Sequence, residues 1–266
     1  MVFSDALNHA SIIDGCRLSR AEIVVYPHLD VAALDLELAR SRVSGFTGRR
    51  IVISETLFSM DGDVADVVAL AAAAKRYDAA LILDEAHAIG VFGPEGRGVS
   101  AASGITPDVL VGTCGKALGS FGAFAATSRA VADLLWTRAR PLVFSTGLPP
   151  MVPAAVRAAI EITRGTEGDQ RRAVLVAHAR LLRSLVSGLG GSSESPIAPL
   201  LVGDDRQVMA MTSQLLETKL FVQGIRPPTV PEGTARLRVS LAAGHAESDV
   251  RLLADALLRS SRLRST

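Results

Sequence analysis

Short apolar runs alternate with helix-like segments along the first half of the chain. The runs predict strands at 51–53, 80–83, 109–111, 121–126 and 142–144. They are apolar at consecutive positions rather than at every second one, which indicates strands that are covered on both faces. Helical patterns at 65–77, with Asp63 as the expected cap, and at 131–137 separate them. The pattern therefore predicts an α/β fold, with a parallel-type sheet between layers of helices.

The pattern changes after Pro149 and Pro150. A helix is expected at 152–162, a polar break at 164–172 and a long helix at 173–186. The remainder alternates as strand 197–202, helix 207–222, strand 236–241 and helix 247–259. We therefore expect a large domain over residues 1–150, and connecting helices with a smaller α/β domain over residues 151–266.

Composition narrows the class of protein. The chain has 266 residues, 48% of them hydrophobic, and a formal net charge of +1. A nearly neutral chain has no electrostatic reason to bind nucleic acid or an anionic membrane surface. The two cysteines, Cys16 and Cys114, do not make a disulfide framework and fit a reducing, cytoplasmic setting. Neither a metal site nor a membrane span is predicted.

Chemistry-bearing residues follow two of the predicted strands. Asp84, Glu85 and His87 come directly after the apolar run at 81–83, and Lys116 lies in a glycine-rich loop after the run at 109–111. In parallel sheets, functional residues gather at the carboxyl ends of strands. A lysine and an aspartate there suit an aldehyde cofactor with a pyridine ring, because the amine forms a Schiff base and the carboxylate keeps the ring nitrogen protonated. The plainer alternative is a lysine in a solvated turn.

The sequence Asp-Glu-Ala-His at 84–87 also occurs as the magnesium-binding box of helicase-type ATPases. That interpretation requires an upstream phosphate loop of the form Gly-x-x-x-x-Gly-Lys-Ser/Thr. Gly115 and Lys116 are followed by Ala117 and lie after the acidic box, which is the reverse order. The sequence therefore favours the cofactor interpretation, with Asp84 at a ring nitrogen and His87 near the ring.

Further candidates carry two interpretations each. The segment 54–63 after the first predicted strand can bind a cofactor or form a turn and helix cap. His9 can act on a cofactor or pack at the surface. Arg236 and Arg238 share one face of a strand and Arg226 lies in a rigid loop before it, so each can bind a carboxylate or lie in solvent. His28, His178 and His245 are interpreted as structural.

Taken in order, these motifs resemble one family, the α-oxoamine synthases, which are fold-type I pyridoxal-phosphate enzymes. The resemblance covers the whole chain and rests on six segments: 9–11, 58–63, 84–91, 113–119, 145–146 and 234–238. The loop 225–233 is most similar to the 8-amino-7-oxononanoate synthase branch, which condenses L-alanine with a pimeloyl thioester, on CoA or a carrier protein, in biotin synthesis. Sibling enzymes that use glycine or serine, of the glycine C-acetyltransferase and 5-aminolevulinate synthase type among them, are the alternative.

The resemblance implies a catalytic role for three residues. Lys116 would hold pyridoxal 5'-phosphate as a Schiff base, His9 would stack on the pyridine ring, and Asp84 would pair with the ring nitrogen. It also implies that residues 1–150 form an incomplete large cofactor-binding domain of the aspartate-aminotransferase-like fold.

Other implied roles surround that centre. His87 and Ser59 would lie near the ring oxygen, Thr113 would contact the cofactor phosphate, and Thr146 would reach the phosphate of the partner subunit in a homodimer. Arg238 would anchor the carboxylate of the amino acid, and Arg226 is a second candidate for a substrate carboxylate. Glu55 matches a recurring acidic position without an assigned role.

Family members carry a further segment before the His9 motif, including a glycine-rich turn that grips the cofactor phosphate. The resemblance therefore implies an N-terminally truncated chain with an uncovered sheet edge and core surface. An inactive remnant of such an enzyme is the second alternative.

Overall fold

The computed structural model describes residues 1–262, with side-chain surroundings given as far as Ser260. The chain divides into two compact units. Unit 1 contains Met1–Phe58 and Ala65–Asp169, and unit 2 contains the short segment Ser59–Val64 and the chain from Gln170. The division falls after Asp169, whereas the sequence pattern placed it at Pro150.

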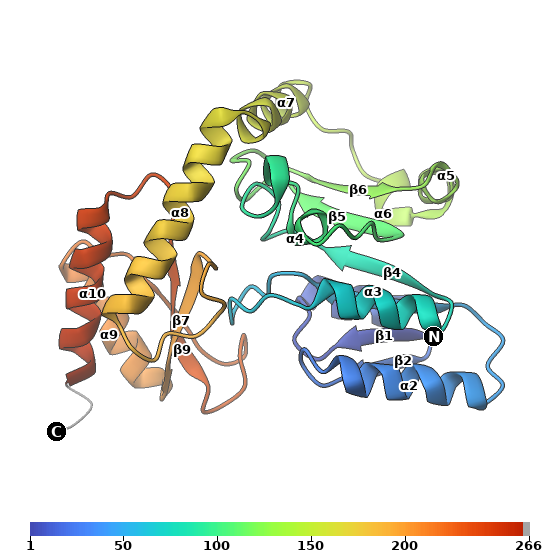
Figure 1. Ribbon diagram of the computed structural model, residues 1–266, viewed down its shortest axis with the longest axis horizontal. Coiled ribbons are helices and arrows are strands. Elements are labelled where there is room, and N and C mark those ends of the chain that lie inside the picture. The colour runs from blue at the N-terminus through green and yellow to red at the C-terminus, as the bar shows by residue number, and fades with distance from the viewer. Residues whose placement is uncertain (263–266) are drawn as a thin grey trace. The chain divides into compact units, whose positions relative to one another are not determined.

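Unit 1 is built on a sheet whose strands run in the order β2-β1-β3-β4-β5-β6 (Figure 1). Neighbouring strands are parallel except β5 and β6, which are antiparallel. The bounds are β1 Val2–Asp5, β2 Ile23–Tyr26, β3 Arg50–Glu55, β4 Ala79–Asp84, β5 Val109–Thr113 and β6 Ala123–Thr127. The predicted α/β architecture is thus confirmed, with a mostly parallel sheet.

The helices α1 to α4 lie between these strands along the chain, and α5 to α7 follow β6; α2 and α3 pack against the sheet (Figure 1). Their bounds are α1 Ala10–Leu18, α2 Val31–Val43, α3 Val67–Arg76, α4 Val99–Ala102, α5 Arg129–Arg138, α6 Arg140–Val143 and α7 Met151–Arg164. A 3₁₀ turn, η1, spans Pro94–Gly96. The side chain of Asp66, not that of Asp63, caps α3 by accepting from Ala69 N at 2.9 Å.

One predicted strand is wrong. Residues 142–144 belong to the end of α6 and the residue after it, not to the sheet. Pro141 occupies one of the first positions of this helix, where its fixed φ suits a helix start and its missing N–H costs nothing. The apolar triplet at 142–144 is therefore a short helix end.

The core of unit 1 lies around β1, β3 and β4 and the two helices packed on them. Its fully buried side chains include Phe3, Val52 and Leu83 from the strands and Leu34 and Leu38 from α2. Asp35 of α2 binds both Arg76 and Tyr77 at the end of α3, which ties the two helices together. This part of the sheet is the rigid base from which the strand ends project.

Unit 2 contains an antiparallel sheet in the order β7-β9-β8. Its strands are β7 Ile197–Gly203, β8 Gln223–Ile225 and β9 Ala235–Ser240, and its helices include α9 Asp205–Glu217 and α10 Glu247–Arg262. The helix α8, Thr166–Leu185, begins in unit 1 and continues into unit 2. The predicted polar break at 164–172 is helical from Thr166 onward, and the helix expected at 207–222 ends at Glu217. Within residues 1–262, no helix is long and apolar enough to cross a membrane.

Candidate functional site

The predicted site residues of unit 1 follow strands that are neighbours in the sheet. The strands β1, β3, β4 and β5 are adjacent and parallel. His9 lies in the turn after β1, His87 and Asp84 lie at the end of β4, and Lys116 follows β5. Because parallel strands end at the same edge, unit 1 brings these residues to one edge of the sheet.

Lys116 is exposed in a tight loop between β5 and β6. Three backbone hydrogen bonds close this loop: Ser120 N to Cys114 O at 2.8 Å, Cys114 N to Gly122 O at 2.8 Å, and Gly119 N to Lys116 O at 3.0 Å. Gly119 has a φ of 58°, which favours glycine. The loop therefore presents an amine to solvent from a backbone with little freedom.

The carboxylate of Asp84 is half-buried at the last position of β4. Its Oδ1 accepts a hydrogen bond from Ala86 N at 2.8 Å, which fixes the orientation of the group. Asp84 pairs with Val111 of β5 in the strand register, five positions before Lys116. His87 is also half-buried in the turn that follows. Acid, imidazole and amine thus come from adjoining strand ends.

His9 caps α1 and is exposed. Its Nδ1 accepts from Ser11 N at 3.2 Å and lies 2.8 Å from Ser11 Oγ. Because a backbone N–H can only donate, Nδ1 is the acceptor, and a neutral His9 carries its proton on Nε2. The cap restrains the ring while leaving its face open, as a stacking role requires.

Glu85, next to Asp84, is a fully buried carboxylate that sequence reasoning left without a role. It accepts from Thr56 Oγ1 at 2.8 Å, Val99 N at 3.0 Å and Ser100 N at 2.7 Å. A Cβ at Gly98 would lie 2.5 Å from its Oε2, so only glycine fits there. Glu85 therefore joins the ends of β3 and β4 to the start of α4 and holds Asp84 in place.

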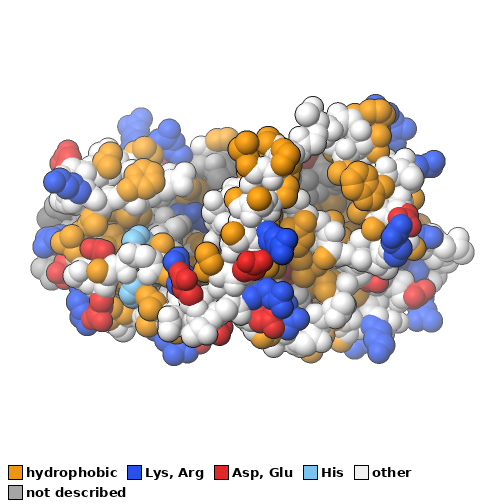
Figure 2. Space-filling model, turned by 90° about the horizontal axis from the view of Figure 1, so that it is seen from above, with side chains coloured by type: hydrophobic (Ala, Val, Ile, Leu, Met, Phe, Trp, Pro, Cys, Tyr) orange, Lys and Arg blue, Asp and Glu red, His pale blue; other side chains and the backbone are white. Residues whose placement is uncertain are grey.

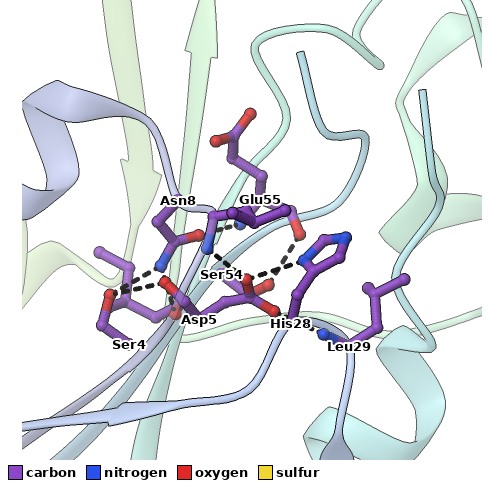
Figure 3. A network of polar contacts seen from close by, with 9 residues as sticks. Ser4, Asp5, Asn8, His28, Leu29, Ser54 and Glu55 are labelled. Atoms are coloured by element: carbon purple, nitrogen blue, oxygen red, sulfur yellow. Dashed lines mark hydrogen bonds and ion pairs between the residues drawn. The ribbon is translucent and has the colours of Figure 1, made fainter. Parts of the chain in front are cut away.

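A second polar network lies at the ends of β1 and β3 (Figure 3). Asp5 accepts from Leu7 N at 2.8 Å, Leu29 N at 2.8 Å and His28 Nδ1 at 2.9 Å. The His28 ring meets Phe58 edge-on, with ring centroids 4.4 Å apart. His28 therefore has a structural partner, as the sequence interpretation expected, but Asp5 was missed. No strand was predicted at Val2–Asp5, so the position of Asp5 at a strand end had no signal in the sequence.

Thr113 contacts its own loop in this structure. Its hydroxyl donates to Gly122 O at 3.2 Å and accepts from Gly115 N at 3.2 Å. It shapes the Lys116 loop, and its contact with a phosphate stays a prediction. Thr146 lies in an exposed segment, and all of residues 141–150 are exposed.

Ser59, Arg226 and Arg238 belong to unit 2. Arg238 Nε donates to Ser59 O and Nη1 donates to Ser240 Oγ at 3.0 Å. Burial lowers the pKa of the Arg238 guanidinium. Arg236, its neighbour on the same face of β9, is paired with Asp61 and is buried, so it is structural. Arg226 is exposed.

Arg238 also lines a pocket of about 600 Å³ in unit 2, together with Phe221, His245 and Leu253 among others. Arg238 is half-buried and lies on the wall of this pocket, whereas Arg236 is buried in its ion pair and Arg226 is exposed.

Comparison with known proteins assigns the chain to a family. Residues 1–257 match the family described as aminotransferase class I and II. The 8-amino-7-oxononanoate synthase of Geobacter sulfurreducens is 47% identical over 264 residues, covering 97% of this chain and 67% of that protein. The corresponding protein of Geobacter metallireducens is 48% identical, covering 94% of this chain and 64% of its own length.

Two solved structures show the same fold. A serine palmitoyltransferase from S. paucimobilis with bound pyridoxal phosphate superimposes with a TM-score of 0.92 at 33% identity, covering 98% of this chain and 66% of that one. An 8-amino-7-oxononanoate synthase from Francisella tularensis has a TM-score of 0.82 at 27% identity, covering 100% and 76%.

The chain belongs to the aminotransferase class I and II family, and the predicted resemblance to α-oxoamine synthases is confirmed. It spans about two thirds of the length of the relatives that it matches. Pyridoxal phosphate is the cofactor of these relatives. The residues of unit 1 fit the pyridine ring of this cofactor. The exposed amine of Lys116, the oriented carboxylate of Asp84 and the open imidazole face of His9 come from neighbouring strand ends.

Proposed function

We propose that the chain carries the catalytic lysine and the ring-binding groups of an 8-amino-7-oxononanoate synthase. The reaction joins L-alanine to the acyl carbon of a pimeloyl thioester and yields 8-amino-7-oxononanoate, carbon dioxide and the free thiol. The observation that carries the proposal is the gathering of Lys116, Asp84 and His9 at one sheet edge of a chain 47% identical to such enzymes.

Each of these residues has a separate task. Bound pyridoxal phosphate supplies an electron sink for the bond-breaking steps at the α-carbon of the amino acid. The Lys116 amine binds the cofactor aldehyde and then takes and returns the proton at that carbon. The Asp84 carboxylate keeps the ring nitrogen protonated, and the His9 ring stacks on one face. His87 and Ser59 would bind the ring oxygen, and Thr113 would bind the phosphate.

Substrate recognition rests on cations of unit 2. A guanidinium binds a carboxylate through two parallel hydrogen bonds, so Arg238 is proposed to hold the carboxylate of L-alanine and Arg226 a second substrate carboxylate. The pimeloyl group has such a carboxylate at its far end. Arg238 is already oriented by Ser59 O and Ser240 Oγ, which supports the first assignment.

The chain offers a direct test because it contains three lysines, Lys75, Lys116 and Lys219. The chain is incubated with pyridoxal phosphate, reduced with borohydride and digested, and the tagged peptide is identified by mass spectrometry. The tag is expected on Lys116, and Lys116→Ala should remove it while Lys75→Ala keeps it. A tag on Lys75 or Lys219, or none on the wild-type chain, would overturn the assignment.

The substrate is tested separately with L-alanine and pimeloyl-CoA, by following the product by mass spectrometry and the free thiol by a colorimetric reagent. One observation favours a second candidate, because the serine palmitoyltransferase structure has the higher TM-score, 0.92 against 0.82. Parallel assays therefore use L-serine with palmitoyl-CoA and glycine with acetyl-CoA or succinyl-CoA. Turnover in one of these assays, without turnover of L-alanine, would assign the chain to a sibling reaction. Tagging of Lys116 without turnover in any of them would identify a binding-competent but inactive remnant.

We further propose that the protein is a cytoplasmic homodimer in which Thr146 reaches the cofactor phosphate of the partner subunit. The exposed segment 141–150 and the apolar side chains around it support this, as do two free cysteines. Light scattering should report a dimer, and a monomer at micromolar concentration would contradict the proposal.

A further inference from the structure

Asn8 lies directly before His9 and holds its turn to the sheet. Its Nδ2 donates to Ile53 O at 3.0 Å and to Ser4 Oγ at 2.9 Å, and its Oδ1 accepts from Glu55 N at 2.9 Å. The side chain is buried, and Figure 3 shows it lying between Ser4 and Glu55. One amide therefore connects the turn after β1 to β1 itself, through Ser4, and to the edge of β3 that faces β1.

The Asn8 contacts extend the pairing of β1 with β3 beyond the end of β1. The backbones of β1 and β3 pair as far as Ser4 and Ile53, and β1 ends at Asp5. The Asn8 side chain then supplies the donor for Ile53 O and the acceptor for Glu55 N that another strand residue would supply. The Asn8 backbone is thus fixed relative to β3, and His9 is the next residue.

Asp5 fixes the same turn from its other end. Its carboxylate binds the N–H groups of Leu7 and Leu29 and the Nδ1 of His28. The segment 5–8 is therefore held at both ends by buried polar side chains, whereas His9 beyond it is exposed. Buried polar groups with all of their partners in place specify one geometry more strictly than apolar packing does.

We propose that Asn8 is a positioning residue, which sets the place of the His9 imidazole on the cofactor ring by joining the β1–α1 turn to the end of β3. This role rests on the proposed function, since His9 is taken to stack on pyridoxal phosphate. Its structural premise, that Asn8 controls the His9 ring, can be measured without the cofactor.

The first measurement uses the cofactor-free chain with ¹³C-labelled histidine. The chain has five histidines, and His9→Gln identifies the His9 signal. Asn8→Ala and Asn8→Asp should shift that signal, because alanine removes all three contacts and aspartate replaces the donor to Ile53 O with an acceptor. The Ser11 amide, which donates to His9 Nδ1, should exchange about tenfold faster with solvent.

The matched control is Ser41→Ala. Ser41 is also buried and polar, and its Oγ accepts from Arg50 Nε at 2.7 Å at the opposite, amino end of β3. Its loss should lower the melting temperature without moving the His9 signal. The proposal is overturned if the Asn8 variants lower the melting temperature but leave the His9 signal and the Ser11 exchange unchanged, because Asn8 would then stabilise without positioning.

The second measurement is the dissociation constant of pyridoxal phosphate, with the visible circular dichroism of the bound cofactor. Asn8→Ala should weaken binding about tenfold and reduce the dichroism, but should change neither further in a His9→Gln background. Full additivity of the two substitutions would overturn the proposal. If the wild-type chain binds no pyridoxal phosphate, the proposed function of the chain fails, while the histidine signal still decides whether Asn8 positions His9.

Discussion

Two regions of unit 1 differ sharply in how completely their side chains are buried: the packed side, formed by β1, β3 and β4, and the exposed side, formed by β6 and α5 to α7. Around β1, β3 and β4, apolar side chains are fully buried and the strand ends are joined by buried polar groups such as Glu85 and Asn8. In β6, α5, α6 and α7, every residue is exposed or half-buried. Large apolar side chains of this second region lie in solvent, Phe121, Trp136, Phe144 and Met151 among them.

Lys116 lies in the loop between these two regions. Its loop begins on β5, which pairs with the packed side through β4, and ends on β6, the exposed edge strand. Figure 2 shows hydrophobic side chains in patches on the surface seen from above. Exposed apolar area of this kind is typical of an interaction surface. The packed side should account for most of the stability of unit 1.

The largest effect should come from deleting one aromatic ring on each side. Phe3 of β1 is 0% exposed and Phe144 after α6 is 73% exposed. We expect Phe3→Ala to lower the free energy of unfolding by about 3–5 kcal/mol. Phe144→Ala should change it by less than about 0.5 kcal/mol, because a solvated ring leaves no cavity. Urea unfolding measures both, and equal losses would show that the two regions are equally packed.

Removing a carboxylate from each side should change the free energy of unfolding almost as unequally. Glu85→Ala removes the acceptor of three hydrogen bonds and leaves Thr56 Oγ1 and two backbone N–H groups without it. The expected loss is about 3 kcal/mol, since donors stranded in the interior are costly. Glu161 of α7 forms an exposed ion pair with Arg157, and Glu161→Ala should cost about 0.5 kcal/mol at most. A loss below 1 kcal/mol for Glu85→Ala would contradict its role as an anchor.

Helix caps provide a finer comparison. Asp66 caps α3 on the packed side and Ser128 caps α5 on the exposed side, each accepting from the N–H three residues later. Asp66→Ala should cost about 1 kcal/mol. Ser128→Ala should cost less, because α5 can fray without opening the core. Hydrogen exchange of the first-turn amides checks where the helices open, and a larger global loss for Ser128→Ala would contradict the comparison.

The sequence predicted what depends on local pattern. The consecutive apolar runs at 51–53, 80–83 and 109–111 are strands, and the chemistry-bearing residues follow the strand ends. The pattern could not show which strands are neighbours, so the bridging roles of Asn8 and Glu85 were missed.

Elements that depend on distant partners were missed for the same reason. The three-residue strand β8 exists only through its pairing with β9. The segment Ser59–Val64 joins unit 2 through contacts such as that of Asp61 with Arg236, far along the chain. No local signal in the sequence encodes such contacts.

The smallest expected effect is on the pH dependence of stability, and it appears only at alkaline pH. It tests whether water reaches the buried Tyr26 on the packed side. Burial raises the pKa of Tyr26 above its ordinary value of 10.0, the Asp5 carboxylate adds to this, and Ser54 opposes it. Because the folded-state pKa is raised, the stability that neutral Tyr26 contributes is complete below pH 10 and falls as the pH rises above it. Tyr26→Phe cannot ionise, so its stability should fall less steeply above pH 10 than that of the wild type.

A second variant isolates the titration itself. The chain has two tyrosines, so Tyr77→Phe leaves Tyr26 as the sole source of tyrosinate absorbance. That absorbance should appear only well above pH 10, together with the loss of far-ultraviolet circular dichroism, because the buried hydroxyl ionises when the packed side opens. Ionisation near pH 10 in a chain that is still folded would show that water reaches the end of β2, and that the contrast between the two sides is smaller than their burial indicates.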